Sequence, residues 1–295
     1  MRIAPRASGC AQGSQTRATA LVLGGIVSVQ IGAAFATTLF DDVGPGGTVF
    51  LRIGFAALIL LAVWRPALRL GARVDRRSVL LLGGALAAMN LSFYAALDRI
   101  PLGIAVTLEF VGPLGVAILA SRRRLDLIWV GLAIVGLVLL APFPGSSLDG
   151  LGCVLALVAG LFWGAYIMLT ARVGQAFAGG AGLAIAMTVA AAAVIPAGVL
   201  DGGAELLDAR ILAIGLAVAL LSSVVPYSLE MEALRRLPEG TFGVLMSLEP
   251  AVAATVGFVG LDQGLEPREI AAIALVLAAS IGALRAAGTP RAAEA

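Results

Sequence analysis

The chain alternates between long apolar runs and short breaks that are polar or rich in glycine and proline. Most runs come close to the length at which a helix crosses a hydrocarbon core of about 30 Å. Because lipid-exposed strands would leave backbone groups unpaired, the runs predict helices. We expect ten transmembrane helices, at about 20–39, 48–64, 78–97, 102–120, 127–141, 151–170, 181–200, 211–229, 240–260 and 270–284.

This pattern predicts an all-α integral membrane protein with five spans in each half. Turn-forming residues mark the breaks, as in the stretch from Asp41 to Gly47 and the tight hairpin from Asp98 to Pro101. The domain organisation that we expect is an N-terminal tail, two units of five helices and a C-terminal tail, at residues 1–19, 20–142, 150–285 and 286–295.

The arginines orient these spans. With the N-terminus inside the cell, only Arg99, Arg210 and Arg268 fall outside, Arg52 falls within a span, and the other sixteen arginines fall inside. Such an excess of positive charge marks cytoplasmic segments. We therefore expect both termini to be cytoplasmic. Residues 1–19 contain no apolar core of their own, so we expect a retained first span rather than a cleaved signal peptide.

Composition supports a membrane protein and excludes several kinds of catalytic and metal site. The chain is 60% apolar and 13% charged, against about 45–50% and about 25% in soluble proteins. It contains no histidine, which excludes histidine-ligated metals and a serine–histidine–aspartate triad, and no lysine, which excludes a P-loop lysine. Cys10 and Cys153 are far apart and match no ligand spacing. We expect no cofactor, no metal, no catalytic residue and no nucleic-acid partner.

One segment recurs 137 positions later. Residues 96–117 and 233–254 align at fixed register. Because five spans separate the copies, and five is odd, the halves would run in opposite directions through the membrane, which is a transporter architecture. The identical positions are Ala96/Ala233, Leu97/Leu234, Arg99/Arg236, Pro101/Pro238, Gly103/Gly240, Leu108/Leu245, Pro113/Pro250 and Ala117/Ala254.

Three charged residues fall well inside predicted spans: Arg52, Glu109 and Glu249. A charge near the bilayer centre costs about 2.5–3.5 kcal/mol on insertion scales, so its presence there points to function. Each glutamate is close to a proline, Pro113 or Pro250, which removes a helical hydrogen bond. A carboxylate beside an interrupted helix is suited to an ammonium group or a proton. The alternative is that the acids pair with Arg52 and hold the helices together.

Polar and aromatic residues within the spans form a second group of candidate substrate-binding residues. Asn90 and Tyr227 are 137 positions apart, and Asn90 and Tyr94 share a helix face. Hydrogen bonding between helices is the alternative role for all of them. Close helix packing is the role that we expect for the motif from Gly160 to Gly164. The second group comprises Gln30, Asn90, Tyr94, Trp163, Tyr166 and Tyr227.

The segment from Met89 to Pro113, MNLSFYAALDRIPLGIAVTLEFVGP, resembles the bacterial threonine/homoserine exporter group of the drug/metabolite transporter superfamily, whose repeat is the EamA domain. The resemblance implies two inverted EamA repeats in the bacterial inner membrane. It further implies a central cavity, alternating access, and proton-coupled export of small amino acids or related metabolites. Membrane lipid surrounds such a protein, and a monomer or a homodimer fits it. Glu109 is the candidate at which this resemblance and the argument from buried charge agree.

Other functions stay open. Exporters of aromatic amino acids or drugs have the same layout, so the cargo is undecided. An intramembrane enzyme acting on lipid-linked substrates would need a clustered catalytic set, whereas the loop acids, such as Asp41, Asp42 and Asp201, lack metal-ligand spacing. A nucleotide-sugar carrier would need several basic residues within spans, and only Arg52 is there.

Overall fold

The computed structural model describes residues 8–65, 76–120, 126–140, 148–177, 180–234 and 245–287, and all regular structure in this part of the chain is helical. The prediction of an all-α protein is therefore confirmed. Within the same residues, six helices are long and apolar enough to cross a membrane. They cover Thr16–Thr37, Phe40–Trp64, Arg76–Leu97, Gly150–Thr170, Ala181–Leu207 and Ala209–Leu229.

The other four predicted spans, 102–120, 127–141, 240–260 and 270–284, overlap further helices in the described part of the chain, and the first of these spans is interrupted at Phe110. The segment 122–124, with its three arginines, and residues 240–244 lie outside the described residues. The helices of the first half are α1 (Ser8–Thr37), α2 (Phe40–Trp64), α3 (Arg76–Leu97), α4 (Leu102–Glu109), α5 (Val111–Ala120) and α6 (Asp126–Leu140). Those of the second half are α7 (Gly150–Ala176), α8 (Ala181–Gly202), the 3₁₀ turn η1 (Gly203–Leu207), α9 (Ala209–Ala219), the π turn η2 (Leu220–Val224), α10 (Val225–Leu234), α12 (Glu249–Leu261) and α13 (Pro267–Ala287).

The expected break from Asp41 to Gly47 is a kink rather than a loop. Helix α2 begins at Phe40 and runs through it, with non-helical backbone at Gly44 (φ 65°, ψ 173°), a conformation that glycine adopts at little cost. Beyond the kink, the backbone N–H of Gly46 donates to Oδ2 of Asp201 at 2.8 Å, at the end of α8. Gly44 therefore bends the helix, and Asp201 ties its start to the second half of the chain.

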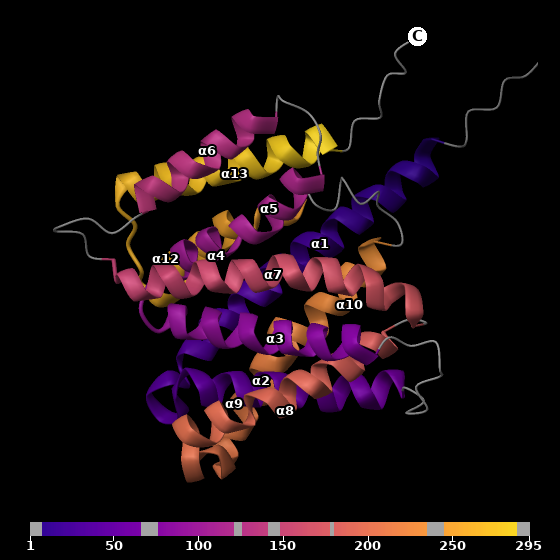
Figure 1. The fold of residues 1–295 in the computed structure, drawn as a ribbon, viewed down its shortest axis with the longest axis vertical. Coiled ribbons are helices and arrows are strands. Elements are labelled where there is room, and N and C mark those ends of the chain that lie inside the picture. The colour runs from indigo at the N-terminus through magenta and orange to yellow at the C-terminus, as the bar shows by residue number, and fades with distance from the viewer. Residues whose placement is uncertain are drawn as a thin grey trace, which may run out of the picture.

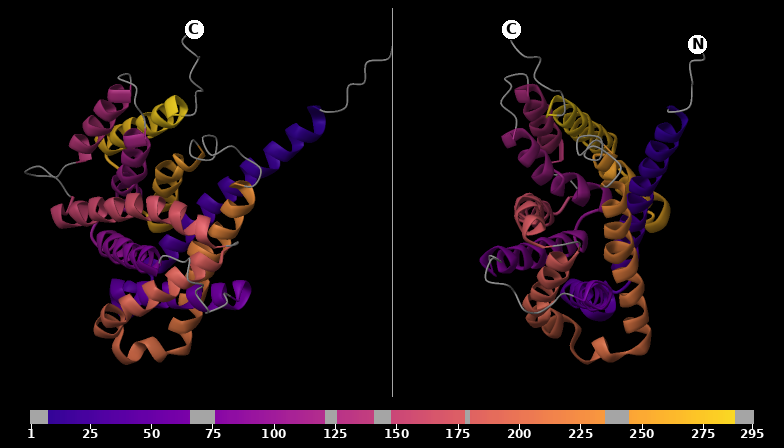
Figure 2. Two further views of the ribbon diagram at one scale, coloured as in Figure 1. Left: turned by 45° about the vertical axis from the view of Figure 1, so that its right-hand side comes forward. Right: turned by 90° about the vertical axis from the view of Figure 1, so that its right-hand side faces the viewer.

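Helices of the two halves pack against each other throughout the molecule. Helices α6 and α13 lie side by side at one end and α2, α8 and α9 at the other, with α3, α4 and α7 between them (Figure 1). Figure 2 shows α1 lying along α10. Further contacts between halves join α2 to α8, α3 to α7 and α4 to α12. The two halves are thus interleaved and share one core.

Each arginine predicted to lie outside the cell has an acidic neighbour. One of these acids, Asp149, caps α7 by accepting a hydrogen bond from the N–H of Gly152 at 2.8 Å. That bond, together with the nearby arginine, lowers the pKa of Asp149. The pairs are Arg99 with Asp149 at 3.5 Å, Arg210 with Asp42 at 4.0 Å and Arg268 with Glu266 at 2.9 Å. Both members of each pair come from segments predicted to lie on the same side of the membrane.

Large apolar side chains cover the outer surface. Leu119 and Leu200 are each 84% exposed, and Leu161 is 70% exposed. Such side chains are stable on the outside of a protein when lipid replaces water as the solvent. Together with the six apolar helices, they describe a protein that crosses a membrane several times.

Helices α5 and α7 cross with their backbones in direct contact. A Cβ atom added to Gly112 would overlap the carbonyl oxygen of Gly160, and one added to Gly160 would lie 2.5 Å from the carbonyl oxygen of Glu109. The close packing expected of the motif from Gly160 to Gly164 is therefore confirmed. This contact presses the Glu109 backbone against α7.

We expect Gly112→Ala to destabilise the protein by about 1–3 kcal/mol, because the obstructing atom belongs to backbone and cannot rotate away. Thermal unfolding in detergent, followed by size-exclusion chromatography, measures the effect. The matched control is Gly115→Ala on the same helix, where an added Cβ meets no atom within 4 Å. Equal unfolding temperatures for the two variants would contradict the contact.

Candidate functional site

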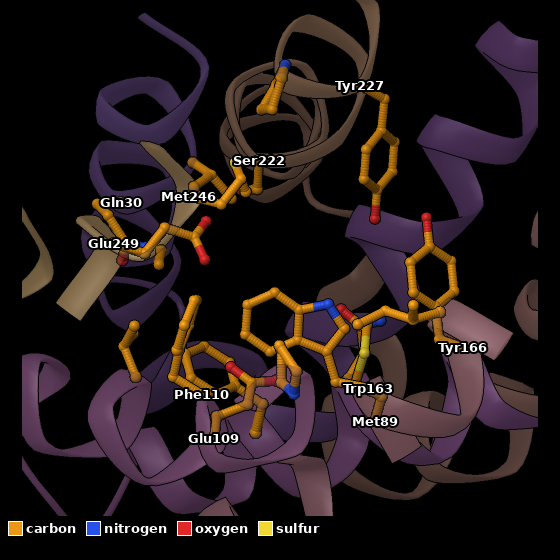
Figure 3. A pocket seen from close by; sticks show the side chains of 18 of the residues that line it. Gln30, Met89, Glu109, Phe110, Trp163, Tyr166, Ser222, Tyr227, Met246 and Glu249 are labelled. Carbon is orange, nitrogen blue, oxygen red and sulfur yellow. The ribbon is translucent and has the colours of Figure 1, made fainter. Parts of the chain in front are cut away.

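A cavity of about 530 Å³ lies between the two halves. We call it the central cavity. Residues from α1, α2, α3, α4, α5, α7, η2, α10, α12 and α13 line it, and its volume is typical of small-molecule sites, which span about 300–1,000 Å³. The sequence candidates that line it are Gln30, Arg52, Asn90, Glu109, Trp163, Tyr166, Tyr227 and Glu249. All of these except Arg52 and Asn90 are labelled in Figure 3. Tyr94 does not line the cavity and is fully buried behind Arg52.

Both candidate carboxylates lie at interruptions of helices. Helix α4 ends at Glu109 and α12 begins at Glu249. Pro113 has no N–H, so the Glu109 carbonyl, four residues earlier, loses its helical donor. Pro250 removes the donor for Met246 in the same way, and Met246 is 137 positions after Glu109. The Glu109 and Glu249 side chains are only 9% and 6% exposed, so each carboxylate is held in a buried, polar break.

A π turn, η2, interrupts the segment that joins α9 to α10. There the N–H of Val225 donates to the carbonyl of Leu220, five residues earlier, and bypasses the carbonyl of Leu221. Pro226 has no N–H to offer the carbonyl of Ser222. The π turn therefore exposes two carbonyls that need donors from elsewhere, a common feature of functional sites.

Helices α1 and α2 supply those donors. The hydroxyl of Ser28 donates to the Leu221 carbonyl at 2.7 Å, and Nη2 of Arg52 donates to the Ser222 carbonyl at 3.0 Å. The Arg52 side chain is 8% exposed, so it stays buried and does not reach toward the membrane surface. These bonds join the first half of the chain to the second beside the central cavity.

Arg52 makes two more hydrogen bonds. Its Nε donates to the hydroxyl of Ser223 at 3.2 Å, and its Nη1 donates to the hydroxyl of Tyr94 at 3.1 Å. The guanidinium also lies over the Tyr94 ring, 5.3 Å from its centroid, which favours a cation–π interaction. None of the three hydrogen-bond partners among the described residues is a carboxylate, although Arg52 interacts electrostatically with Glu109. Arg52 is therefore a fixed positive charge on the cavity wall.

The remaining candidates differ in what they contact. Nδ2 of Asn90 donates to the carbonyl of Leu86 in its own helix at 2.8 Å, and the residue lines the cavity. Trp163 packs edge-on against Phe110, with ring centroids 5.5 Å apart. Figure 3 shows the phenol groups of Tyr166 and Tyr227 facing each other at one side of the cavity. The described residues contain no cluster of three or more cysteine and acidic side chains that is able to hold a metal ion.

Comparison with known proteins gives consistent results. The chain is 44% identical over 264 residues to the threonine/homoserine exporter RhtA of Escherichia coli K12, a match that covers 89% of each protein. It is 45% identical over 257 residues to RhtA of Salmonella typhimurium LT2, covering 86% of this chain and 87% of that protein. The sequence profile of the EamA-like transporter family matches residues 150–285. The chain belongs to the EamA-like transporter family.

A solved structure with 17% identity to this transporter aligns over 92% of this chain and 97% of its own, with a TM-score of 0.62. At that identity the alignment shows a shared fold and nothing about cargo. As a member of a family of membrane transporters, with six membrane-length apolar helices, the chain is a multi-pass inner-membrane protein and not an enzyme.

Sequence reasoning missed several residues around the cavity of this EamA-like transporter. Ser222 lines the cavity and Ser223 binds Arg52, and the signal for both was a serine pair three to four residues before a proline within a span. Ser28 gave no signal, because its role depends on a carbonyl in the other half. Thr170 and Ser280 also line the cavity, and single hydroxyls in apolar helices are too common to single out.

Proposed function

We propose that this transporter exports small amino acids of the threonine and homoserine type across the bacterial inner membrane by alternating access, coupled to protons. The observation that carries this proposal is one cavity between the halves that holds both an arginine and two carboxylates. An amino acid is a zwitterion, whose carboxylate suits the arginine and whose ammonium group suits the carboxylates. The names of the relatives, threonine/homoserine exporters, agree with this cargo.

The proposal includes ten spans arranged as two inverted repeats, 20–142 and 150–285. If a two-fold axis passes through the cavity, equivalent positions of the two repeats should lie on opposite walls. Several pairs of residues that are 137 positions apart line the cavity, and these pairs support the repeat. The pairs are Val29 and Tyr166, Gln30 and Ile167, Ala33 and Thr170, Met89 and Pro226, Asn90 and Tyr227, and Glu109 and Met246.

Helix packing supports the same symmetry. Equivalent helices contact each other in the pairs α2 with α8 and α6 with α13. The contact of α3 with α7 has its counterpart in the contact of α1 with α10. The arginine–acid pairs support the assignment of their segments to one side of the membrane, and the distribution of arginines supports cytoplasmic tails at residues 1–19 and 286–295.

Within this scheme, Glu109 and Glu249 receive the substrate ammonium group or the coupling proton, and Arg52 fixes the electrostatic field that orients the zwitterion. Asn90, Tyr166, Tyr227 and Gln30 offer hydrogen bonds, while Trp163 closes the apolar side. Tyr94 holds Arg52 and does not meet the substrate. All of these groups come from one chain, so the proposal needs no more than a monomer, and a homodimer fits it equally.

An aromatic cargo is the second candidate, since Phe93, Phe110, Trp163, Tyr166 and Tyr227 all line the cavity. Such side chains stack readily on an aromatic amino acid. The transport assay below distinguishes the two cargoes.

We expect the purified protein in liposomes with an acidic interior to accumulate labelled threonine and homoserine, since protons leaving the vesicle drive the amino acid in. A protonophore should abolish the accumulation, and protein-free liposomes should show none. Excess phenylalanine should compete weakly. Strong competition by phenylalanine would reassign the cargo, and absence of movement of any amino acid under any gradient would overturn the proposed function.

A further inference from the structure

On helices α4 and α12 the central cavity stops before the side of the membrane that is predicted to be outer. Helix α4 begins on that side, but the first of its residues to line the cavity is Val106. Helix α12 ends on that side, and Glu249 is the only residue of this helix that lines the cavity. In the proposed repeat, residues 250–253 are equivalent to 113–116, three of which do line it. The same part of the repeat is therefore open to the cavity in one half and closed in the other.

Outward of the cavity, α4 and α12 pack with their backbones in contact (Figure 1). A Cβ atom added to Gly103 would lie 2.6 Å from Cα of Ala254, so no side chain fits between the helices there. A Cβ atom added to Gly257 would lie 3.6 Å from Cβ of Leu102. We call the contact formed by these four residues the outer seal. Because packing this close leaves no room for a solute, the outer seal closes the gap between the halves at α4 and α12.

A glutamine bridges the outer seal. Gln263 follows the end of α12, and its backbone N–H donates to the carbonyl of Gly257 at 3.1 Å. Its side-chain Oε1 accepts a hydrogen bond from the N–H of Leu102, the first residue of α4, at 2.9 Å. The first N–H groups of a helix have no partner within that helix, and Pro101 provides no side-chain cap. A residue of the second half therefore caps a helix of the first half.

We propose that Gln263 is a latch that holds the outer seal closed, and that its hydrogen bond to Leu102 breaks each time the cavity opens to the outside. This assignment rests on the alternating access of the proposed function and names a residue that sets the balance between its two states. A neutral acceptor suits a bond that must break, because hydrogen bonds to a charged acceptor are roughly twice as strong. A carboxylate here would also interact favourably with the positive end of the α4 dipole. The amide thus favours the closed state without locking it.

The test measures how fast a cavity residue is labelled from the outer side. Met89 lines the cavity (Figure 3), and Met89→Cys places a thiol there, in a background with Cys10→Ser and Cys153→Ser. Intact cells are treated with a membrane-impermeant methanethiosulfonate reagent, which reaches the thiol from outside only when the outer seal opens. Gln263→Leu should raise the labelling rate roughly fivefold, because one net hydrogen bond no longer favours the closed state.

Gln263→Glu should act in the opposite direction. Its charged acceptor strengthens the bond to Leu102, so labelling from outside should slow, and so should threonine uptake into liposomes. Inverted membrane vesicles present the inner side to the same reagent, and there the wild-type background should be labelled faster than in cells. The reverse order would show that the closed side is the inner one and would overturn the latch.

Gly257→Ala weakens the latch without altering Gln263. Its added Cβ would lie 2.8 Å from Oε1 and displace the amide, so labelling from outside should again rise. The matched control is Gly260→Ala on the same helix, where an added Cβ meets no atom within 4 Å and the labelling rate should stay unchanged.

Unchanged labelling in both Gln263→Leu and Gln263→Glu would overturn the latch, while threonine uptake by the wild-type protein would leave the proposed function standing. Labelling needs no cargo, so it tests the latch even if the transport assay overturns the proposed cargo. If Gln263→Leu fails to fold, Gln263→Glu and Gly257→Ala decide.

Discussion

Glu109→Gln should lower threonine uptake into acidic liposomes by roughly 100-fold. The carboxylate is buried at the end of α4 and faces the central cavity. Glutamine has nearly the same shape but neither takes up nor releases a proton, and it carries no charge for an ammonium group. A charge-assisted interaction lost in a desolvated site is worth about 3 kcal/mol, which corresponds to the stated factor.

Substrate exchange separates the two roles of Glu109. If the carboxylate carries only the coupling proton, Glu109→Gln should still exchange labelled threonine outside for unlabelled threonine inside, without any gradient. If it binds the ammonium group, exchange should disappear as well. The matched control is Glu205→Gln, an acid in η1 whose side chain is exposed and away from the cavity. Full gradient-driven uptake by Glu109→Gln would contradict both roles.

Much of this site is predictable from the sequence, because a charged side chain within a membrane span is costly and therefore rare. A carboxylate within an apolar run is costly unless it has a function or a partner, so the surrounding sequence alone identifies Glu109 and Glu249 as candidates. Their prolines gave the helix interruptions, since a missing N–H acts locally. What is local in the chain was therefore predictable: the apolar helices, the breaks and most of the polar and charged residues that line the cavity.

The parts that could not be predicted depend on contacts between distant residues. The stretch from Leu220 to Val224 reads as an ordinary helix, and its π turn is stable because Ser28 and Arg52 reach its freed carbonyls from the other half. The kink at Gly44 was predicted as a loop, because the local sequence does not reveal that Asp201 accepts a hydrogen bond from the N–H of Gly46. Glycine and proline in the local sequence predict where the backbone departs from a helix, but not whether the departure is a kink or a loop.

Under the proposed inverted repeat, the frame of the cavity is symmetric and its lining is asymmetric. Glu109 is equivalent to Met246, Gln30 to Ile167, and Glu249 to Gly112. In each pair, one half supplies a polar group where the other supplies an apolar or absent side chain. A symmetric frame is suited to opening alternately on either side, whereas a chiral zwitterion needs different groups on opposite walls. Divergence at these few positions reconciles the two requirements.

Arg52→Gln should both destabilise the protein, by about 3 kcal/mol, and reduce transport more than tenfold. The change leaves the Ser222 carbonyl without its donor in a buried π turn, and removes the charge from the wall. Arg52→Lys should be intermediate, because lysine keeps the charge but lacks the planar fork that reaches three partners. Thermal unfolding in detergent and liposome uptake, measured on the same preparations, separate the two effects.

A second substitution tests the cause. Pro226→Ala restores a backbone N–H that is able to donate to a freed carbonyl of the π turn. In the background of Arg52→Gln it should recover part of the lost stability but not the transport, because the positive charge is still missing. Tyr94→Phe, which removes one acceptor of Arg52 and keeps the ring beneath it, should cost far less in both assays. Additive losses in the Arg52→Gln, Pro226→Ala double variant would show that Arg52 does not act through the Ser222 carbonyl, since independent sites add and coupled ones do not.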